Sequence, residues 1–310
     1  MKKATILENC RLCPRACGVN RAAGALGWCR AGASPEVYRW GPHFGEEPPL
    51  TATKGSGAVF FSKCTLACTY CQNWPWSQGG KGEKITVEKL ADIFRELHSA
   101  GCHNWNLVSP TPWLPMIAES LEMLKALGIS LPIVYNTSGF ETCRTLDDFA
   151  PMMDIALCDL RYASSSTAGE ASAASSYVEN ARAAVRWFWN NLGALRTDEH
   201  GVATGGLICR ILALPGHVNE AVESLRWLAE TIGTQVSVSV MSQYTPVYKA
   251  LEKAPWNRKV YEEEYELLRI AVDEFGFDNG WVQEFEGDAP AGLLGQTMSA
   301  GEGAVGKSCV

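Results

Sequence analysis

Histidine is scarce in this chain, and long hydrophobic runs and dense basic blocks are missing from it. Its 310 residues include five histidines, His43 among them, with no ligand spacing, so we expect these to be polar surface groups. No apolar run approaches the roughly 18 residues of a membrane span, so we expect no membrane partner. The net charge is −7, and without clustered Lys and Arg we expect no nucleic-acid partner.

The start of the sequence has no secretion-signal pattern. Polar Glu8 and Asn9 follow the basic opening before any apolar segment develops, so we expect a cytoplasmic protein. The composition is 46% hydrophobic and 20% charged, which is ordinary for a globular protein and excludes a disordered or fibrous chain. The length fits two domains or one α/β barrel.

Cysteine, by contrast, is abundant, with 12 residues. In a reducing compartment, cysteines in a chain of this length are typical of metal or catalytic sites rather than disulfides. Seven of them fall into two tight groups: Cys10, Cys13, Cys17 and Cys29 in the first, and Cys64, Cys68 and Cys71 in the second. The remaining five are scattered, and we expect them in the core: Cys102, Cys143, Cys158, Cys209 and Cys309.

Three parts of the chain differ in pattern. Residues 1–50 have little periodicity and too little apolar material to fold alone, which predicts a Cys-rich, metal-binding extension. Residues 51–285 alternate strand and helix patterns. Residues 286–310 are rich in Gly and Ala and are expected to form a flexible tail.

The alternation in the second part predicts an α/β fold. The expected strands lie near 58–61, 106–108, 132–135, 154–158, 207–214, 236–241 and 281–282, and the expected helices near 86–100, 114–124, 142–150, 177–192, 218–232 and 261–275. The strands are mostly apolar throughout, as in a parallel sheet covered on both faces. An open doubly wound sheet and a full or partial barrel both fit, and each places its site at the carboxyl ends of the strands. Residues 164–176 are predicted to form a low-complexity loop.

The second cysteine group has the spacing C-x3-C-x2-C and directly follows the first of these strands. Three thiolates within eight residues can hold three corners of a cubane [4Fe–4S] cluster. No fourth cysteine is near, so one iron would lack a protein ligand. An open coordination position distinguishes a catalytic metal site from a closed structural one.

With this motif in this place, the sequence resembles the radical S-adenosylmethionine (SAM) enzymes. In that superfamily the open iron binds the amine and carboxylate of SAM, and an electron from the cluster cleaves the sulfonium. The 5′-deoxyadenosyl radical that is released abstracts a hydrogen atom. The resemblance implies SAM as a cofactor and an electron donor such as flavodoxin or ferredoxin as a partner.

The resemblance narrows to the PflX-like relatives of the pyruvate formate-lyase (glycyl radical enzyme) activating enzymes. The segments that carry it are CRLCPRACGVNR, GEEPPL, KGSGAVFFSKC, CTYCQN, VYNTSG and SQYTPVY. This likeness implies a partial (β/α)6 TIM-like barrel with a small Cys-rich N-terminal extension. It also implies a substrate that is a glycine of a partner glycyl radical enzyme, with a small molecule or a peptide as the alternative.

By position, the resemblance implies further site residues at the strand ends. Asp159 and Arg161 join the three cysteines as catalytic residues, and the cofactor-binding residues are Tyr70, Asn73, Ser109, Thr111, Asn136, Ser138, Arg210 and Gln243. Tyr244 would face the same pocket. The family's Gly-Gly-Glu, which holds the SAM amine, is missing, and residues 109–112 read Ser-Pro-Thr-Pro in its place.

The first cysteine group, C-x2-C-x3-C-x11-C, has the four thiolates of a closed site. Its metal is either a second [4Fe–4S] cluster, which suits electron relay, or a structural zinc ion. Two other functions compete with the enzyme. One is a non-catalytic iron-sulfur electron carrier, favoured by the missing Gly-Gly-Glu. The other is a zinc-binding interaction protein, which the three-cysteine group fits poorly because it is one ligand short.

Overall fold

The computed structural model describes residues 3–285, so the predicted tail and Cys309 lie outside the described residues. Within residues 3–285, ten strands form one sheet in the order β10-β9-β8-β6-β5-β4-β2-β1-β3, with β7 paired to β8. The strands are β1 (Glu36–His43), β2 (Ser56–Phe61), β3 (Glu83–Lys84), β4 (Trp105–Val108), β5 (Ile133–Thr137), β6 (Ile155–Asp159), β7 (Arg196–Thr197), β8 (Ala203–Leu212), β9 (Ser237–Met241) and β10 (Gly280–Val282). The helices are α1 (Lys3–Glu8), α2 (Pro48–Thr51), α3 (Trp74–Ser77), α4 (Val87–Ser99), α5 (Leu114–Lys125), α6 (Cys143–Phe149), α7 (Ser165–Ser172), α8 (Tyr177–Leu192), α9 (Val218–Thr231) and α10 (Glu262–Glu274).

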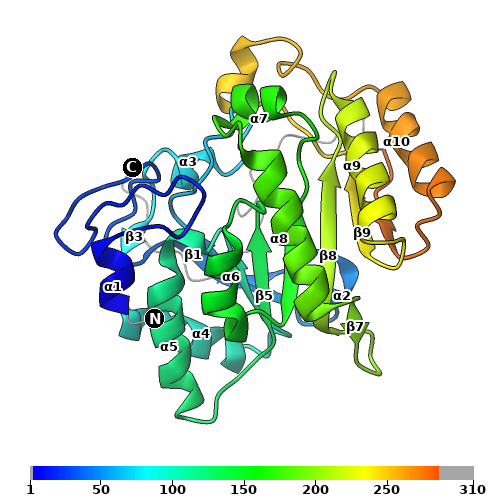
Figure 1. Cartoon of the computed structure of the whole chain (residues 1–310). Helices are drawn as coiled ribbons and strands as arrows, with labels where there is room; N and C mark the ends of the chain where they lie inside the picture. The colour runs from blue at the N-terminus through cyan, green and yellow to red at the C-terminus, as the bar shows by residue number, and fades with distance from the viewer. Residues whose placement is uncertain (1–2, 286–310) are drawn as a thin grey trace, which may run out of the picture.

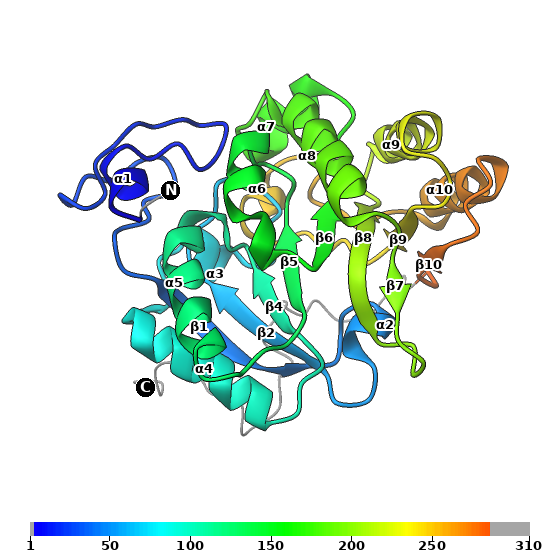
Figure 2. The same ribbon diagram turned by 60° about the horizontal axis from the view of Figure 1, so that its bottom comes forward.

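Six strands run parallel and alternate with helices. They are β2, β4, β5, β6, β8 and β9, and β10 extends the parallel set at one end. At the other end β1 pairs with β2 in the antiparallel direction. Figure 2 shows these strands as an open arc, with the longer helices on its outer side. The predicted α/β fold, a partial (β/α)6 barrel, is confirmed.

The sequence pattern explains these elements. Every residue of β2, β4, β5 and β6 is buried, as expected for strands covered on both faces. Helix α4 begins after Thr86, whose side chain accepts a hydrogen bond from the backbone N–H of Lys89 at 3.2 Å. Its buried face, which includes Leu90 and Phe94, packs on the sheet side.

Helix α2 closes the bottom of the barrel. Its Leu50 packs against residues of three different strands, among them Val134, Ile155 and Ile208. Figure 1 shows the N-terminal segment, in blue, at one flank of the barrel, and the strand ends point toward α7. The two residues before α2, Glu46 and Glu47, line the cavity that lies above this floor.

Three smaller expectations are wrong. The predicted loop at 164–176 contains helix α7, because Ser164 caps its first turn and small residues such as Ala168 pack closely in the core. Cys143 lies exposed at the start of α6, whereas Cys102, Cys158 and Cys209 are buried as predicted. His43 is not a surface group: it is buried at the end of β1, with its ring edge-on to Phe60 at 6.0 Å.

Candidate functional site

The three-cysteine segment follows β2 and is hydrogen-bonded through its backbone to the C-terminal end of α7. The backbone N–H of Ala67 donates to the carbonyl of Ser172 at 3.2 Å, and that of Thr69 donates to the carbonyl of Ala171 at 2.8 Å. This pairing explains why the α7 segment is ordered. It also fixes the backbone that carries Cys64, Cys68 and Cys71 at the carboxyl end of the barrel.

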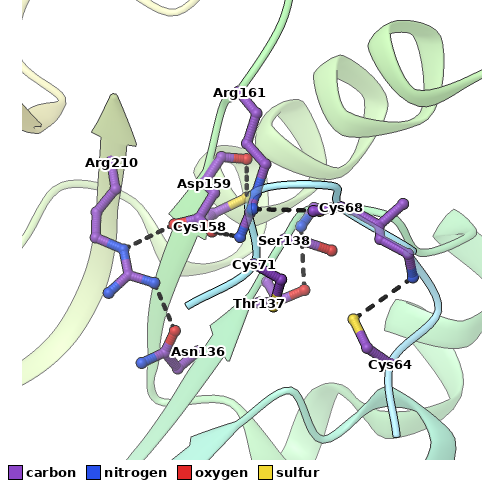
Figure 3. Close-up of polar contacts among 12 residues, drawn as sticks. Cys64, Cys68, Cys71, Asn136, Thr137, Ser138, Cys158, Asp159, Arg161 and Arg210 are labelled. Carbon is purple, nitrogen blue, oxygen red and sulfur yellow. Dashed lines mark hydrogen bonds and ion pairs between the residues drawn. The ribbon is translucent and has the colours of Figure 1, made fainter. Parts of the chain in front are cut away.

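The three sulfurs sit in a largely buried, polar pocket. Ser172 Oγ lies 2.9 Å from the Cys68 sulfur. Arg161 Nη1 lies 3.6 Å from the same sulfur (Figure 3). The Cys71 sulfur lies 3.3 Å from Ser77 Oγ. Hydrogen bonds from hydroxyl and guanidinium groups stabilise sulfur that carries negative charge.

Burial changes the acidity of these thiols. Burial, with a smaller contribution from the nearby Cys68, raises the pKa of Cys64 to about 12 and that of Cys71 to about 11. Three thiolates here therefore need additional positive charge, which an iron cluster supplies. In residues 3–285, no three Cys, His, Asp or Glu side chains converge as ligands of a single metal ion. A cubane does not require that convergence, since it distributes its thiolates over separate irons. The three cysteines fit such a cluster.

An ion-pair network extends from the cysteines into the barrel. Arg161 binds both the Cys68 sulfur and the Asp159 carboxylate at the end of β6. On the other side of Asp159, Arg210 Nε lies 2.8 Å from Oδ1, and its Nη2 donates to Asn136 Oδ1 at 2.7 Å (Figure 3). Burial opposes the charge on Asp159, but Arg210 and Arg161 outweigh it and hold the pKa of this carboxyl below its usual range.

The predicted site residues meet in one cavity of about 360 Å³. It is lined by the predicted residues Tyr70, Cys71, Asn73, Ser109, Asn136, Ser138, Asp159, Arg161, Arg210, Gln243 and Tyr244. Thr111 and Cys64 line a small pocket instead, which shares Ser109 and Ser138 with the large one. Cys68 lines neither, but it contacts Arg161. The four N-terminal cysteines lie outside both cavities.

Sequence reasoning missed several buried acids. Glu141, 1% exposed, accepts hydrogen bonds from Thr111 Oγ1 at 2.7 Å and Thr137 Oγ1 at 2.6 Å. Glu46 and Glu47 line the large cavity. A signal existed for the last two, because they belong to the GEEPPL segment that carries the family resemblance. No periodicity or motif marked Glu141, whose partners come from two different strand ends.

The N-terminal cysteines form a separate group. Burial raises the pKa of Cys13 to about 12 and also raises that of Cys29, and the other sulfurs of the group add to both shifts. Arg21 Nη1 lies 3.8 Å from the Cys10 sulfur, and the backbone N–H of Trp28 donates to the Cys17 sulfur at 3.4 Å. Of the four thiols, that of Cys13 is buried, those of Cys10 and Cys29 are partly buried, and that of Cys17 is exposed. Four thiols grouped with these donors also fit a metal centre.

Arg15 lies between the two cysteine groups. Its Nε donates to the carbonyl of Thr65 at 3.2 Å, which ties the N-terminal segment to the loop that carries Cys64. Its guanidinium stacks 4.1 Å from the ring centre of Trp28. Burial lowers the pKa of Arg15, while the sulfurs of both groups oppose that change. Sulfurs of both cysteine groups therefore interact electrostatically with the Arg15 guanidinium.

Comparison with known proteins gives one family match. A model described as the Radical SAM superfamily matches residues 58–164, the stretch from β2 to the end of the network around Arg161. An uncharacterized protein of Methanocaldococcus jannaschii is 27% identical over 281 residues, which is 88% of this chain and 77% of the relative.

Two solved structures are more distant. SuiB of Streptococcus suis aligns with a TM-score of 0.47 and 14% identity over 72% of this chain. The FeFe-hydrogenase maturase HydG of Carboxydothermus hydrogenoformans aligns with a TM-score of 0.40 and 13% identity over 70% of this chain. The chain covers 47% of the SuiB chain and 56% of the HydG chain, about half the length of each.

In residues 3–285, no helix is both long and apolar enough to cross a membrane. The family match covers the strand before the three-cysteine motif, the motif itself, and the next βα units. Residues 58–164 therefore match a radical SAM superfamily domain, and that match implies a [4Fe–4S] cluster and SAM as cofactors.

Proposed function

We propose that this protein is a radical SAM enzyme that abstracts a hydrogen atom from a substrate held inside its barrel. The observation that carries the proposal is that the three-cysteine motif adjoins the large cavity: Cys71 lines it, and Cys68 contacts Arg161, which lines it and belongs to the buried ion-pair network. The cluster and SAM together supply a 5′-deoxyadenosyl radical by reductive cleavage of the sulfonium.

The protein's own residues hold and orient these groups. Cys64, Cys68 and Cys71 would ligate three irons and leave one for SAM. Asn136 and Ser138 line the cavity at the end of β5, where hydroxyl and amide groups suit a ribose. Arg161 places positive charge beside the Cys68 sulfur. Tyr70, packed 5.5 Å from Trp256 and hydrogen-bonded to Tyr162, forms an apolar wall for the adenine.

We infer that Glu141 supports the segment that stands in place of the family's Gly-Gly-Glu, by accepting a hydrogen bond from Thr111. It lies on the neighbouring strand's loop but binds Thr111, which occupies the corresponding segment after β4. Its second oxygen, Oε2, is buried and has no hydrogen-bond partner. Glu141 is a positioning residue in this proposal, since it orients the Thr111 and Thr137 hydroxyls.

The finer proposals concern the second metal centre and the partners. We favour a second [4Fe–4S] cluster at Cys10, Cys13, Cys17 and Cys29, because Arg15 adjoins both cysteine groups and electrons pass efficiently between neighbouring clusters. Such a centre would receive electrons from a donor such as flavodoxin or ferredoxin.

Two substrate classes remain candidates. The sequence motifs shared with the activating enzymes, such as GEEPPL and VYNTSG, support an activase-like enzyme that acts on a glycine of a protein. The buried acids of the cavity support a small-molecule substrate.

The experiment is anaerobic iron reconstitution followed by product analysis with dithionite and SAM. The wild-type protein is expected to yield 5′-deoxyadenosine, and Cys71→Ala to yield none. Cys143→Ala, which removes an exposed thiol, is the matched control and should behave as the wild type. Equal yields from the wild type and Cys71→Ala, or none from fully iron-loaded wild type, would overturn the proposal.

A further inference from the structure

Glu47 presents an unpaired carboxylate oxygen inside the large cavity. The residue is 8% exposed, lines the cavity, and its Oε2 is buried without a hydrogen-bond partner. Arg210 and a hydrogen bond from Ser239 stabilise the Glu47 carboxylate in part, but burial outweighs them and Oε2 is left without a donor. A buried carboxylate oxygen in this position is unfavourable unless positive charge or a donor compensates it. Glu47 therefore marks a place where a ligand group of complementary chemistry is missing.

The cations already in the cavity are engaged elsewhere. Each nitrogen of the Arg210 guanidinium has a partner: Nε binds Asp159, Nη1 lies 3.4 Å from Glu46 Oε2, and Nη2 binds Asn136. Arg161 binds Asp159 and the Cys68 sulfur. Within residues 3–285, the cavity lining contains three carboxyl groups but only two guanidinium groups among its Asp, Glu and Arg side chains. The carboxyls belong to Glu46, Glu47 and Asp159, and the guanidiniums to Arg161 and Arg210. The imidazole of His43 also lines the cavity. One carboxyl group is in excess.

The surroundings of Glu47 suit an organic cation. Phe60 and Trp281 line the same cavity, and aromatic faces attract ammonium and guanidinium groups. Burial raises the pKa of both Glu46 and Glu47, and Arg210 only partly offsets this. A bound cation supplies the charge that Glu47 needs to stay ionised.

The network also separates Glu47 from the cysteines. Going from the Cys68 sulfur, successive ion pairs lead through Arg161, Asp159 and Arg210 to Glu46, the neighbour of Glu47. Cys64, Cys68 and Cys71 would hold the cluster, and with it SAM, at that end of the network. The carboxylate of Glu47 is then left for a different molecule at the barrel floor.

We propose that the floor of the barrel binds the positively charged nitrogen of a small organic molecule, with the Glu47 carboxylate as its counter-ion. That this molecule is the substrate whose hydrogen is abstracted rests on the proposed function. The cation site itself rests only on the buried acids, the engaged arginines and the aromatic wall.

The test is isothermal titration calorimetry, in which small probe molecules are added to the reconstituted holoenzyme in the presence of SAM. The probes are the cations n-butylammonium and n-butylguanidinium, the neutral n-butanol and the anion butyrate. We expect a cation to bind at least about tenfold more tightly than butanol or butyrate. Glu47→Gln should weaken cation binding by about tenfold, whereas Glu199→Gln, at an exposed acid, should leave it within about twofold.

Glu47→Asp is a second variant at the same position that keeps the carboxylate. It is expected to retain the preference for cations, which would show that weaker binding in Glu47→Gln comes from the lost charge and not from a misfolded protein. Several results would overturn the proposal: no cation binding, equal affinity for the neutral isostere, or unchanged affinity in Glu47→Gln. Tighter binding of neutral N-acetylglycinamide than of the cations would also overturn it, in favour of a glycine of a protein. Release of 5′-deoxyadenosine by the wild type is measured separately. If the product forms but no cation binds, only the cation site has failed; if no product forms, the proposed function has failed.

Discussion

Arg161 Nη1 lies 3.6 Å from the sulfur of Cys68, close enough for a charge-assisted contact to a ligating thiolate. The same guanidinium binds Asp159, so the cysteine motif after β2 and the end of β6 are joined directly. This link connects the metal-binding loop to the polar interior of the barrel. It also gives the protein a means to tune the cluster, because hydrogen bonds to its sulfurs change reduction potential.

Arg161→Gln is expected to make the cluster harder to reduce. The substitution removes a positive charge beside the Cys68 sulfur, which destabilises the more negative, reduced state. Potentiometric titration followed by electron paramagnetic resonance should show a more negative midpoint, and SAM cleavage should slow by about tenfold. Arg269→Gln, on the exposed face of α10, is the control. A midpoint equal to that of wild type would count against this role.

Asp159→Asn is expected to destabilise the fold. It leaves Arg161 and Arg210 buried without their shared counter-charge, which costs about 3 kcal/mol in the free energy of unfolding. Because the folded pKa of Asp159 is lowered, its contribution is present above the unfolded pKa of about 4 and is lost as the pH falls from there through the folded pKa. Urea unfolding at pH 7 and at about pH 2 measures the stability difference between Asp159→Asn and the wild type, which should shrink at the lower pH.

Glu266→Gln serves as the control for that experiment, since its partner Arg269 is about half exposed. Exposed pairs contribute less than about 1 kcal/mol. An Asp159→Asn protein as stable as the control would show that the network does not hold the site together.

The iron-free protein should show slow alkylation of its site thiols. The pKa of Cys64 is raised to about 12 and that of Cys71 to about 11, so little thiolate forms at pH 8. Iodoacetamide, followed by peptide mass spectrometry, should modify both at least about tenfold more slowly than the exposed Cys143. The difference should narrow as the pH rises toward 11. Rates equal to that of Cys143 at pH 8 would contradict the buried geometry.

Metal counting decides what the N-terminal group binds. With two [4Fe–4S] clusters the reconstituted protein should hold about eight irons, and Cys13→Ala should lose about four of them. About four irons with one zinc in the wild type would assign the N-terminal centre to zinc. The Cys71→Ala protein gives the complementary count, because it should keep only the N-terminal metal.

Much of the fold follows from local patterns. The Thr86 cap of α4, the apolar faces of α4 and α9, and the apolar strands β4 to β6 are signals that each segment carries by itself. Helix α7 was missed because its Ser and Ala residues have no strong periodicity. Its order depends on backbone hydrogen bonds to the three-cysteine loop about 100 residues earlier, and no local pattern reports such a contact.

The site was predictable where a motif or a strand end marked it. Cys64, Asp159 and Arg210 belong to that class. Glu141 does not, because its importance comes from burial and from partners on other elements. Glu47 lies in the GEEPPL motif, but the motif alone does not reveal that its Oε2 is buried without a hydrogen-bond partner. Sequence patterns locate the ends of strands, but the side chains that share a cavity are settled only when the barrel closes around them.

The central claim is that three cysteines hold a cluster with one iron open to SAM. Electron–nuclear double resonance on the reduced protein, with SAM carrying ¹⁵N in its amine and ¹⁷O in its carboxylate, tests it most directly. The account predicts couplings from both labels, which disappear in Cys71→Ala. A reduced cluster with SAM present in excess and no coupling to either nucleus would contradict it.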